Sequence, residues 1–333
     1  MMASLFKNSG ITSRIILNKI PESRLMLYNI CQNRSSELLE TQPLNINMDS
    51  IASLAPVVAI LCCSGIAAGF LAGLLGVGGG IIFVPVYYFI FTDWFAMAPD
   101  EAIVLATCTS LATMIPTTMA SSLSHIRHDN YLRELLFRWL PWLCGGVAAG
   151  TALSHFFGGG WLSTLFGCIL LFAACNLIFF SKARGIFTEL PSKGFQAFIA
   201  LGISCLSVML GIGGGTLTVP FLSLFRDMDT KKIVGTASVI GLIVCLPGAV
   251  ITIIMDVIDV LKLPENVYTS FNNAPALTFG HICFPAVLCV APFAMLFAPL
   301  GVRLNRKLPP HIIKIIFGIM VVFTSIKMLM SGG

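Results

Sequence analysis

After residue 50, the chain is a succession of apolar runs separated by short polar connections. A helix that crosses a membrane needs about 20 consecutive apolar residues. Runs of this length lie at 51–75, 102–124, 135–156, 161–181, 194–210, 233–255, 277–299 and 311–330. Two shorter runs, near 80–92 and 215–225, each follow a glycine cluster. This pattern predicts an all-α polytopic membrane protein with about ten transmembrane segments, two of which are short and interrupted by glycine.

The composition agrees with a membrane protein. Hydrophobic residues make up 56% of the chain and charged residues 11%, whereas a soluble domain carries about 25% charged residues. So few charges cannot cover the surface of a water-soluble fold, which excludes a cytosolic enzyme and a nucleic-acid-binding protein. Most of the 11 cysteines lie within apolar runs and none forms a CxxC pair. We therefore expect them to pack as small hydrophobes, and we expect no metal site and no cofactor.

Residues 1–50 differ from the rest of the chain because they are polar and of mixed charge. They contain no long apolar stretch of the kind that a cleaved secretory signal requires. We expect a disordered extension, and Met48 would also serve as a start directly before the first apolar run.

Lysine and arginine gather in four of the connections between apolar runs. The connections 125–138, 181–194, 226–232 and 301–310 hold 12 of the 20 basic residues. The positive-inside rule places such connections in the cytoplasm. Two segments separate each basic connection from the next, so the count of ten segments is self-consistent and both termini lie outside. We expect a multi-pass protein of the cell (inner) membrane.

The chain also repeats itself. Residues 76–85 read GVGGGIIFVP and residues 211–220 read GIGGGTLTVP, with six of ten positions identical. Further along, Gly150 matches Gly301 at a longer offset, which implies an insertion at 257–276 in the second half. The pattern predicts two repeats of five segments, which occupy 51–190 and 191–333. Because five is an odd number, the second repeat would cross the bilayer upside down, an arrangement typical of secondary transporters.

The duplicated glycine cluster is the candidate substrate site. Each glycine costs a helix interior about 1 kcal/mol relative to alanine, and a bilayer tolerates loosened backbone only where it is buried in protein or lines a cavity. Bare N–H groups at the start of a short helix attract anions. Pro85 and Pro220 are expected to kink the short helices, and hydroxyl groups nearby could add donors. The predicted substrate-binding residues are Gly76, Gly78, Gly79, Gly80, Gly211, Gly213, Gly214, Gly215, Thr216, Thr109, Ser110, Thr236 and Ser238.

Structural interpretations stand beside this functional one. Small residues let membrane helices pack closely, and this is the role expected of Gly65, Gly69, Gly73, Gly145, Gly146 and Gly150. The hydroxyl groups could equally bond to their own helix backbones. His281 lies inside a predicted span and is a candidate to line the path. Apart from edge residues such as Asp256, no carboxylate lies within a predicted span, which argues against a proton relay through carboxylates and for an anionic substrate.

The two glycine motifs, SHIRHDN after the third span, and FGHICFP followed by APLGVRLNRKLPPHIIKIIFG resemble the TauE/SafE sulfite exporter family, also called the TSUP permeases. The resemblance covers about 51–330. It implies secondary transport of small sulfur-containing anions such as sulfite or organosulfonates. We interpret the chain as a transporter that works by alternating access around the glycine motifs.

Two other functions remain as alternatives. The first is an anion channel with a glycine-lined constriction. The second is an intramembrane enzyme or assembly protein, against which no span shows a catalytic constellation. The expected partners are the anionic substrate and the lipid bilayer, without nucleic acid, and a homo-oligomer stays open.

Overall fold

A computed structural model describes residues 48–156, 159–179, 187, 190–225, 229–262, 274–275, 277–305, 322 and 325–326. The chain divides into two units, Met1–Ala55 and Pro56–Gly333. Of the first unit, the structure describes only the start of helix α3, so most of the predicted N-terminal extension lies outside the described residues. The architecture below is that of the second unit.

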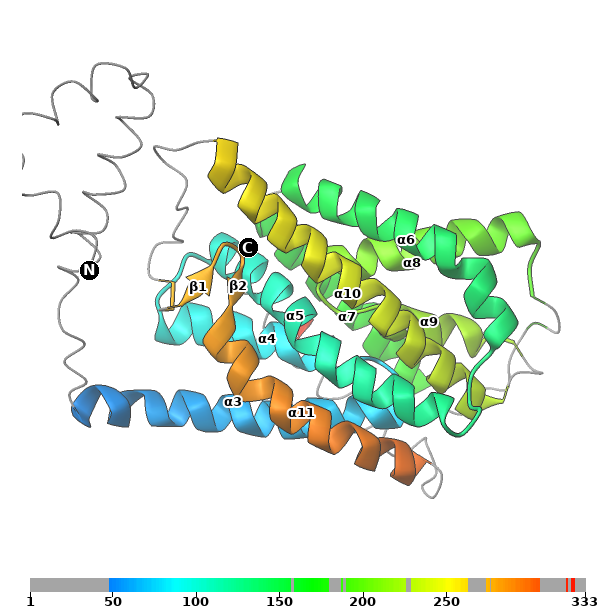
Figure 1. Ribbon diagram of the computed structural model, residues 1–333, viewed down its shortest axis with the longest axis horizontal. Helices are drawn as coiled ribbons and strands as arrows, with labels where there is room; N and C mark the ends of the chain where they lie inside the picture. The colour runs from blue at the N-terminus through cyan, green and yellow to red at the C-terminus, as the bar shows by residue number, and fades with distance from the viewer. Residues whose placement is uncertain are drawn as a thin grey trace, which may run out of the picture. The chain divides into compact units, whose positions relative to one another are not determined.

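Helices occupy nine of the ten predicted apolar segments (Figure 1). They are α3 (Met48–Leu75), α4 (Gly80–Phe89), α5 (Pro99–Ile126), α6 (Arg133–Phe156), α7 (Gly159–Phe179), α8 (Lys193–Met209), α9 (Gly215–Leu222), α10 (Thr230–Lys262) and α11 (Phe284–Asn305). A π-helical turn, η1 (Ile90–Trp94), extends α4. The tenth segment, predicted at 311–330, lies outside the described residues except for three positions.

The segment predicted at 277–299 is different in the structure. It begins with a hairpin of two short antiparallel strands, β1 (Thr278–Phe279) and β2 (Ile282–Cys283), and only then does α11 start. The prediction of a helix from 277 was wrong because the backbone takes a left-handed conformation at Leu277 (φ 62°) and Gly280 (φ 52°). Such residues do not continue a right-handed helix.

Helix α10 is longer than the sequence predicted. The span was expected to end at 255, yet the helix continues to Lys262, into the region assigned to the insertion. No glycine or proline interrupts the chain between Val250 and Pro264, and a proline is where helices usually end. Asp256 therefore lies inside this helix and not at its edge.

Among the described residues, four helices are long and apolar enough to cross a membrane. They are Leu54–Leu75, Pro99–Ile126, Thr230–Ile258 and Phe284–Leu304. The apolar helices Gly80–Trp94, Gly159–Phe172 and Lys193–Met209 are shorter. The chain is thus a mostly helical membrane protein.

Helix α5 is the central element of the second unit. It packs against α4, α10 and α11, while α6 packs along α8 (Figure 1). Several hydroxyl groups on α5 are buried, and many bond back to the helix itself, as when Thr113 Oγ1 donates to Thr109 O at 2.9 Å and Thr118 Oγ1 to Met114 O at 2.7 Å. Because these bonds satisfy the hydroxyl groups locally, α5 can be buried despite its polar residues.

Small residues bring the helices of the two halves into close contact. A Cβ added to Gly65 of α3 would lie 2.7 Å from the carbonyl oxygen of Val290 in α11, and one on Gly69 would lie 2.5 Å from the Cα of Ala294. Gly73, Gly146 and Gly150 are equally crowded by backbone of a neighbouring helix. The packing role expected of these five glycines is confirmed. It is wrong for Gly145, around which no described residue comes within 4 Å.

Two close contacts between helices are related to each other by the internal repeat. A Cβ on Gly150 of α6 would lie 2.5 Å from Cys205 O of α8, and one on Gly301 of α11 would lie 3.0 Å from the carbonyl carbon of Phe70 in α3. In the internal repeat, Gly150 corresponds to Gly301. Phe70 corresponds to Cys205, because the two lie 135 residues apart, as the two glycine motifs do. The same contact is therefore made twice.

Candidate functional site

The two glycine motifs, 135 residues apart in the sequence, lie directly against each other in the structure. A Cβ added to Gly80 would lie 2.6 Å from Gly211 O, and one added to Gly215 would overlap the carbonyl group of Gly76. Gly80 corresponds to Gly215 and Gly76 to Gly211, so the contact is reciprocal. Only glycine allows two backbone segments to approach this closely.

The loops of the two motifs share two left-handed turns but differ at the fourth residue, where Gly79 is left-handed (φ 87°) and Gly214 is right-handed (φ -55°). Gly76 (φ 70°) and Gly211 (φ 63°) have left-handed backbones, as do Gly78 (φ 79°) and Gly213 (φ 65°) two residues later. These turns aim the chain into the short helices α4 and α9, which begin at the last glycine of each motif. The motifs therefore place two helix N-termini next to each other in the interior of the protein.

Backbone N–H groups at these two N-termini are unsatisfied. The N–H groups of Gly78–Gly80 and of Gly213–Gly215 have no hydrogen-bond acceptor in the part of the chain that the structure describes. All six residues are buried. Buried N–H groups without a partner are rare in folded proteins, and at a helix N-terminus they carry part of the positive end of the helix dipole. The two motifs together can therefore accept an anion.

The side chain of Met114 fills the space between the two motifs. A Cβ on Gly78 or on Gly213 would overlap the terminal methyl group of Met114, and one on Gly80 would lie 2.8 Å from its sulfur. Met114 is fully buried on α5. Sequence reasoning missed this residue, since a methionine in an apolar run looks like ordinary core. An unbranched thioether adapts its shape readily, so this side chain can yield space to a ligand.

Two of the predicted hydroxyl residues contact the motifs. Ser110 Oγ donates to Gly211 O at 2.8 Å, which ties the second motif to α5. Thr216 Oγ1 donates to Val77 O at 3.1 Å and so ties the second motif to the first. Both bonds hold the two motifs in register with each other.

The other three hydroxyl groups take part in contacts elsewhere. Thr109 Oγ1 accepts the N–H of Cys283 at 3.0 Å, which holds the β-hairpin on α5. Thr236 Oγ1 donates to Lys232 O at 2.6 Å, and Ser238 Oγ donates to Val234 O at 3.0 Å, both within α10. Thr236 and Ser238 therefore bond to the backbone of their own helix, whereas Thr109 bonds to the hairpin.

Pro85 and Pro220 lie inside α4 and α9 at corresponding positions. Both helices continue past the proline, α4 to Phe89 and α9 to Leu222. The kink expected at each proline stays a prediction.

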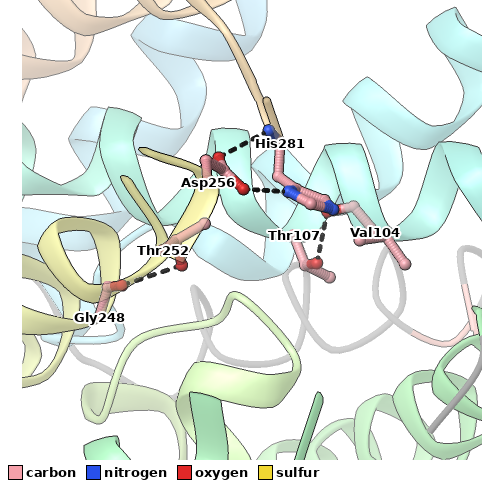
Figure 2. Close-up of polar contacts among 6 residues, drawn as sticks. All are labelled: Val104, Thr107, Gly248, Thr252, Asp256 and His281. Atoms are coloured by element: carbon pink, nitrogen blue, oxygen red, sulfur yellow. Dashed lines mark hydrogen bonds and ion pairs between the residues drawn. The ribbon is translucent and has the colours of Figure 1, made fainter. Parts of the chain in front are cut away.

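One charged pair lies apart from the glycine motifs (Figure 2). Asp256 of α10 accepts two bonds from His281 in the hairpin, from ring Nδ1 at 2.5 Å and from the backbone N–H at 3.0 Å. Asp256 falls within the apolar span Thr230–Ile258. The sequence analysis excepted Asp256 as an edge residue, and it lies two residues before the end of this span, although α10 itself continues to Lys262.

Comparison with known proteins identifies the family of this chain. The family model described as "Sulfite exporter TauE/SafE" matches residues 61–328 of the chain. The chain belongs to this family. It is 26% identical to a "Probable membrane transporter protein" of Haemophilus influenzae, over 82% of this chain and 98% of that protein. The "Probable membrane transporter protein YunE" of Bacillus subtilis is also 26% identical, over 82% of this chain and 97% of the relative.

A third relative, a probable membrane transporter protein of Methanocaldococcus jannaschii, is 26% identical over 80% of this chain and 95% of its own length. No solved structure matches the chain. The chain is thus a member of a family of membrane transporters, as its glycine motifs indicated.

Proposed function

We propose that this protein is a secondary transporter of small sulfur-containing anions, such as sulfite or organosulfonates, in the cell (inner) membrane. The observation that carries the proposal is the pair of buried helix N-termini at Gly78–Gly80 and Gly213–Gly215, whose N–H groups lack acceptors among the described residues. An oxyanion supplies several acceptor oxygens and negative charge at once. The membership in the TauE/SafE family supports sulfur oxyanions as the substrate class.

The chemistry of the site suits an anion that is bound and then released. Among the buried residues that the structure describes there is no lysine or arginine, so N–H groups and helix dipoles would hold the substrate without a formal positive charge. A transport site must bind its substrate firmly enough to select it and weakly enough to release it. Neutral donors meet this requirement better than a buried cation would.

The reciprocal contacts support ten segments in two inverted five-segment repeats. The internal repeat converts the contact Gly80–Gly211 into the contact Gly215–Gly76. It likewise converts Gly150–Cys205 into Gly301–Phe70. A two-fold relation between the halves produces each contact twice. In transporters with inverted repeats, rocking of one half against the other opens a midplane site to each side in turn. We propose this alternating access for the site between the glycine motifs.

Uptake into proteoliposomes tests the proposal. The full chain is reconstituted and uptake of radiolabelled sulfite is measured, with sulfate, thiosulfate, sulfoacetate and a simple carboxylate as competitors. A carrier shows saturable flux and counterflow, in which unlabelled sulfite inside accelerates entry of label. Competition by sulfoacetate and not by the carboxylate supports the substrate class. Flux that does not saturate and shows no counterflow would favour the anion channel instead.

A further inference from the structure

The ion pair of Asp256 and His281 is the strongest polar feature that the glycine site does not use. Its carboxylate lies on α10 near the end of the candidate span Thr230–Ile258, and the side chains of His281 and Asp256 are 24% and 14% exposed (Figure 2). Ionisable residues inside membrane spans are costly to bury and usually mark ion or substrate pathways. The pair is therefore not sealed inside the protein.

The fold holds this pair firmly. The backbone N–H of His281 donates to the same carboxylate that its ring contacts. Gly280, with φ 52°, leaves room for the carboxylate, because a Cβ there would overlap the side chain of Asp256. The next strand is fixed to α5 by the bond from Cys283 N–H to Thr109. The hairpin thus links the charged end of α10 to the centre of α5.

The same turn of α5 contacts the second glycine motif. A Cβ on Gly211 would lie 2.7 Å from the Cα of Thr107, and Ser110 bonds to Gly211 O. Because Thr109 holds the hairpin and Ser110 holds the glycine motif, a charge on the pair acts on the motif through protein, where electrostatic interactions are stronger than in water.

We propose that the Asp256–His281 pair binds the proton that drives transport, so that one proton enters with each anion. This inference rests on the proposed function and names its coupling ion. With a neutral imidazole the pair carries one negative charge, which repels an anion at the glycine motifs. A proton added to the imidazole nitrogen removes that net charge.

The polar groups around the pair come from α10 and α5. On α10 the neighbouring polar side chain is Thr252, whose hydroxyl donates to Gly248 O at 3.0 Å (Figure 2). On α5 they are Thr107, whose hydroxyl donates to Val104 O at 2.9 Å (Figure 2), and the thiol of Cys108, the next residue in the sequence. Within the described residues, no salt bridge other than that to His281 engages Asp256.

A pH gradient across proteoliposomes tests the coupling. The probe is radiolabelled methanesulfonate, because its charge does not change across the pH range used. With the outside about one pH unit more acidic than the inside, one-to-one coupling predicts up to about tenfold accumulation. Counterflow of the same probe at equal pH reports binding and translocation without a net proton movement.

Two variants separate the coupling from the transport. In Asp256→Asn and His281→Gln we expect pH-driven accumulation to be lost and counterflow to persist. The amide oxygen introduced by Asp256→Asn would still accept the backbone N–H of His281, and thermal unfolding in detergent checks that each variant is folded. Asp93→Asn is the matched control, since Asp93 lies in η1 at a helix end and bonds only to Thr92 among the described residues. It should keep both accumulation and counterflow.

The outcomes are distinguishable. Wild-type protein without counterflow of any anion tested, sulfite included, would overturn the proposed function and this inference with it. Counterflow without pH-driven accumulation would overturn the inference alone. Accumulation that persists in both folded variants would do the same, because the proton would then bind elsewhere.

Discussion

At the scale of the residue, Gly213 shows how tightly the candidate site is packed. Its backbone is left-handed, and the methyl group of Met114 occupies the space where a side chain would begin. We expect Gly213→Ala to lower sulfite uptake about tenfold, because strain of this kind costs about 1–3 kcal/mol and a loss of about 1.4 kcal/mol is a factor of ten.

The control for this variant is Gly202→Ala on α8, around which no described residue comes within 4 Å. It should keep uptake and gain up to about 1 kcal/mol of stability, since alanine favours a helix interior. Unchanged uptake in Gly213→Ala would show that the second motif does not form the site.

Ser110 makes a second prediction at this scale. Its hydroxyl group donates to Gly211 O and is buried. Ser110→Ala leaves that carbonyl without this donor, which costs about 1–3 kcal/mol. We expect a lower midpoint of thermal unfolding in detergent and a higher Km for sulfite. Thr164→Ser, at an exposed hydroxyl on α7, should change neither quantity. Equal effects of the two substitutions would contradict a special role for Ser110.

At the scale of the element, the crossing of α3 and α11 depends on a row of glycines one turn apart. Gly69 touches the backbone of Ala294, so a larger side chain must push the two helices apart. We predict that Gly69→Val destabilises the protein by about 3 kcal/mol, the upper part of the range for overpacked interiors. The measurement is the yield of monodisperse protein in detergent and its thermal unfolding.

Gly145→Val provides the comparison, because the same side chain enters open space on α6. It should leave yield and unfolding almost unchanged. Sensitivity of the Gly145 variant equal to that of the Gly69 variant would mean that helix propensity, not packing, limits both.

Element boundaries were predictable where the physical cause is local. The starts of α4 and α9 follow from glycine clusters, and the ends of most helices from nearby glycine, proline or charged residues. The β-hairpin before α11 was missed. Its turn depends on Gly280 leaving room for Asp256, which is 24 residues away in the sequence, and no local pattern reports such a contact.

At the scale of the whole molecule, the inverted arrangement makes a prediction about topology. Reporter fusions in the connection between Asp93 and Glu101 and in the connection after Arg303 should report opposite sides of the membrane. The connection after Arg303 is rich in basic residues, so the positive-inside rule places it in the cytoplasm. The connection between Asp93 and Glu101 has no basic residue, so we expect it on the external side. Both reporters on the same side would contradict the inverted repeats.

A control fusion in the basic connection between Ile126 and Arg133 should agree with the one after Arg303. Both connections carry arginine, and an even number of segments would separate them. Disagreement between these two fusions would show that the count of segments is wrong.

Much of this protein follows from its sequence alone. The apolar runs require a helical membrane protein, because a backbone in lipid must satisfy its own hydrogen bonds. The repeated GVGGG and GIGGG strings identified both halves of the candidate site. These conclusions depend on composition and short-range pattern, which a sequence displays directly.

Only the tertiary structure decided which groups meet. It placed Gly80 against Gly211, put Met114 between the motifs and paired Asp256 with His281. It also separated Gly145, which faces open space, from Gly146, which packs on α8. Such contacts join residues that are far apart in the chain, and their partners are set by how helices pack in three dimensions. A sequence read from one end to the other contains the residues but not their neighbours.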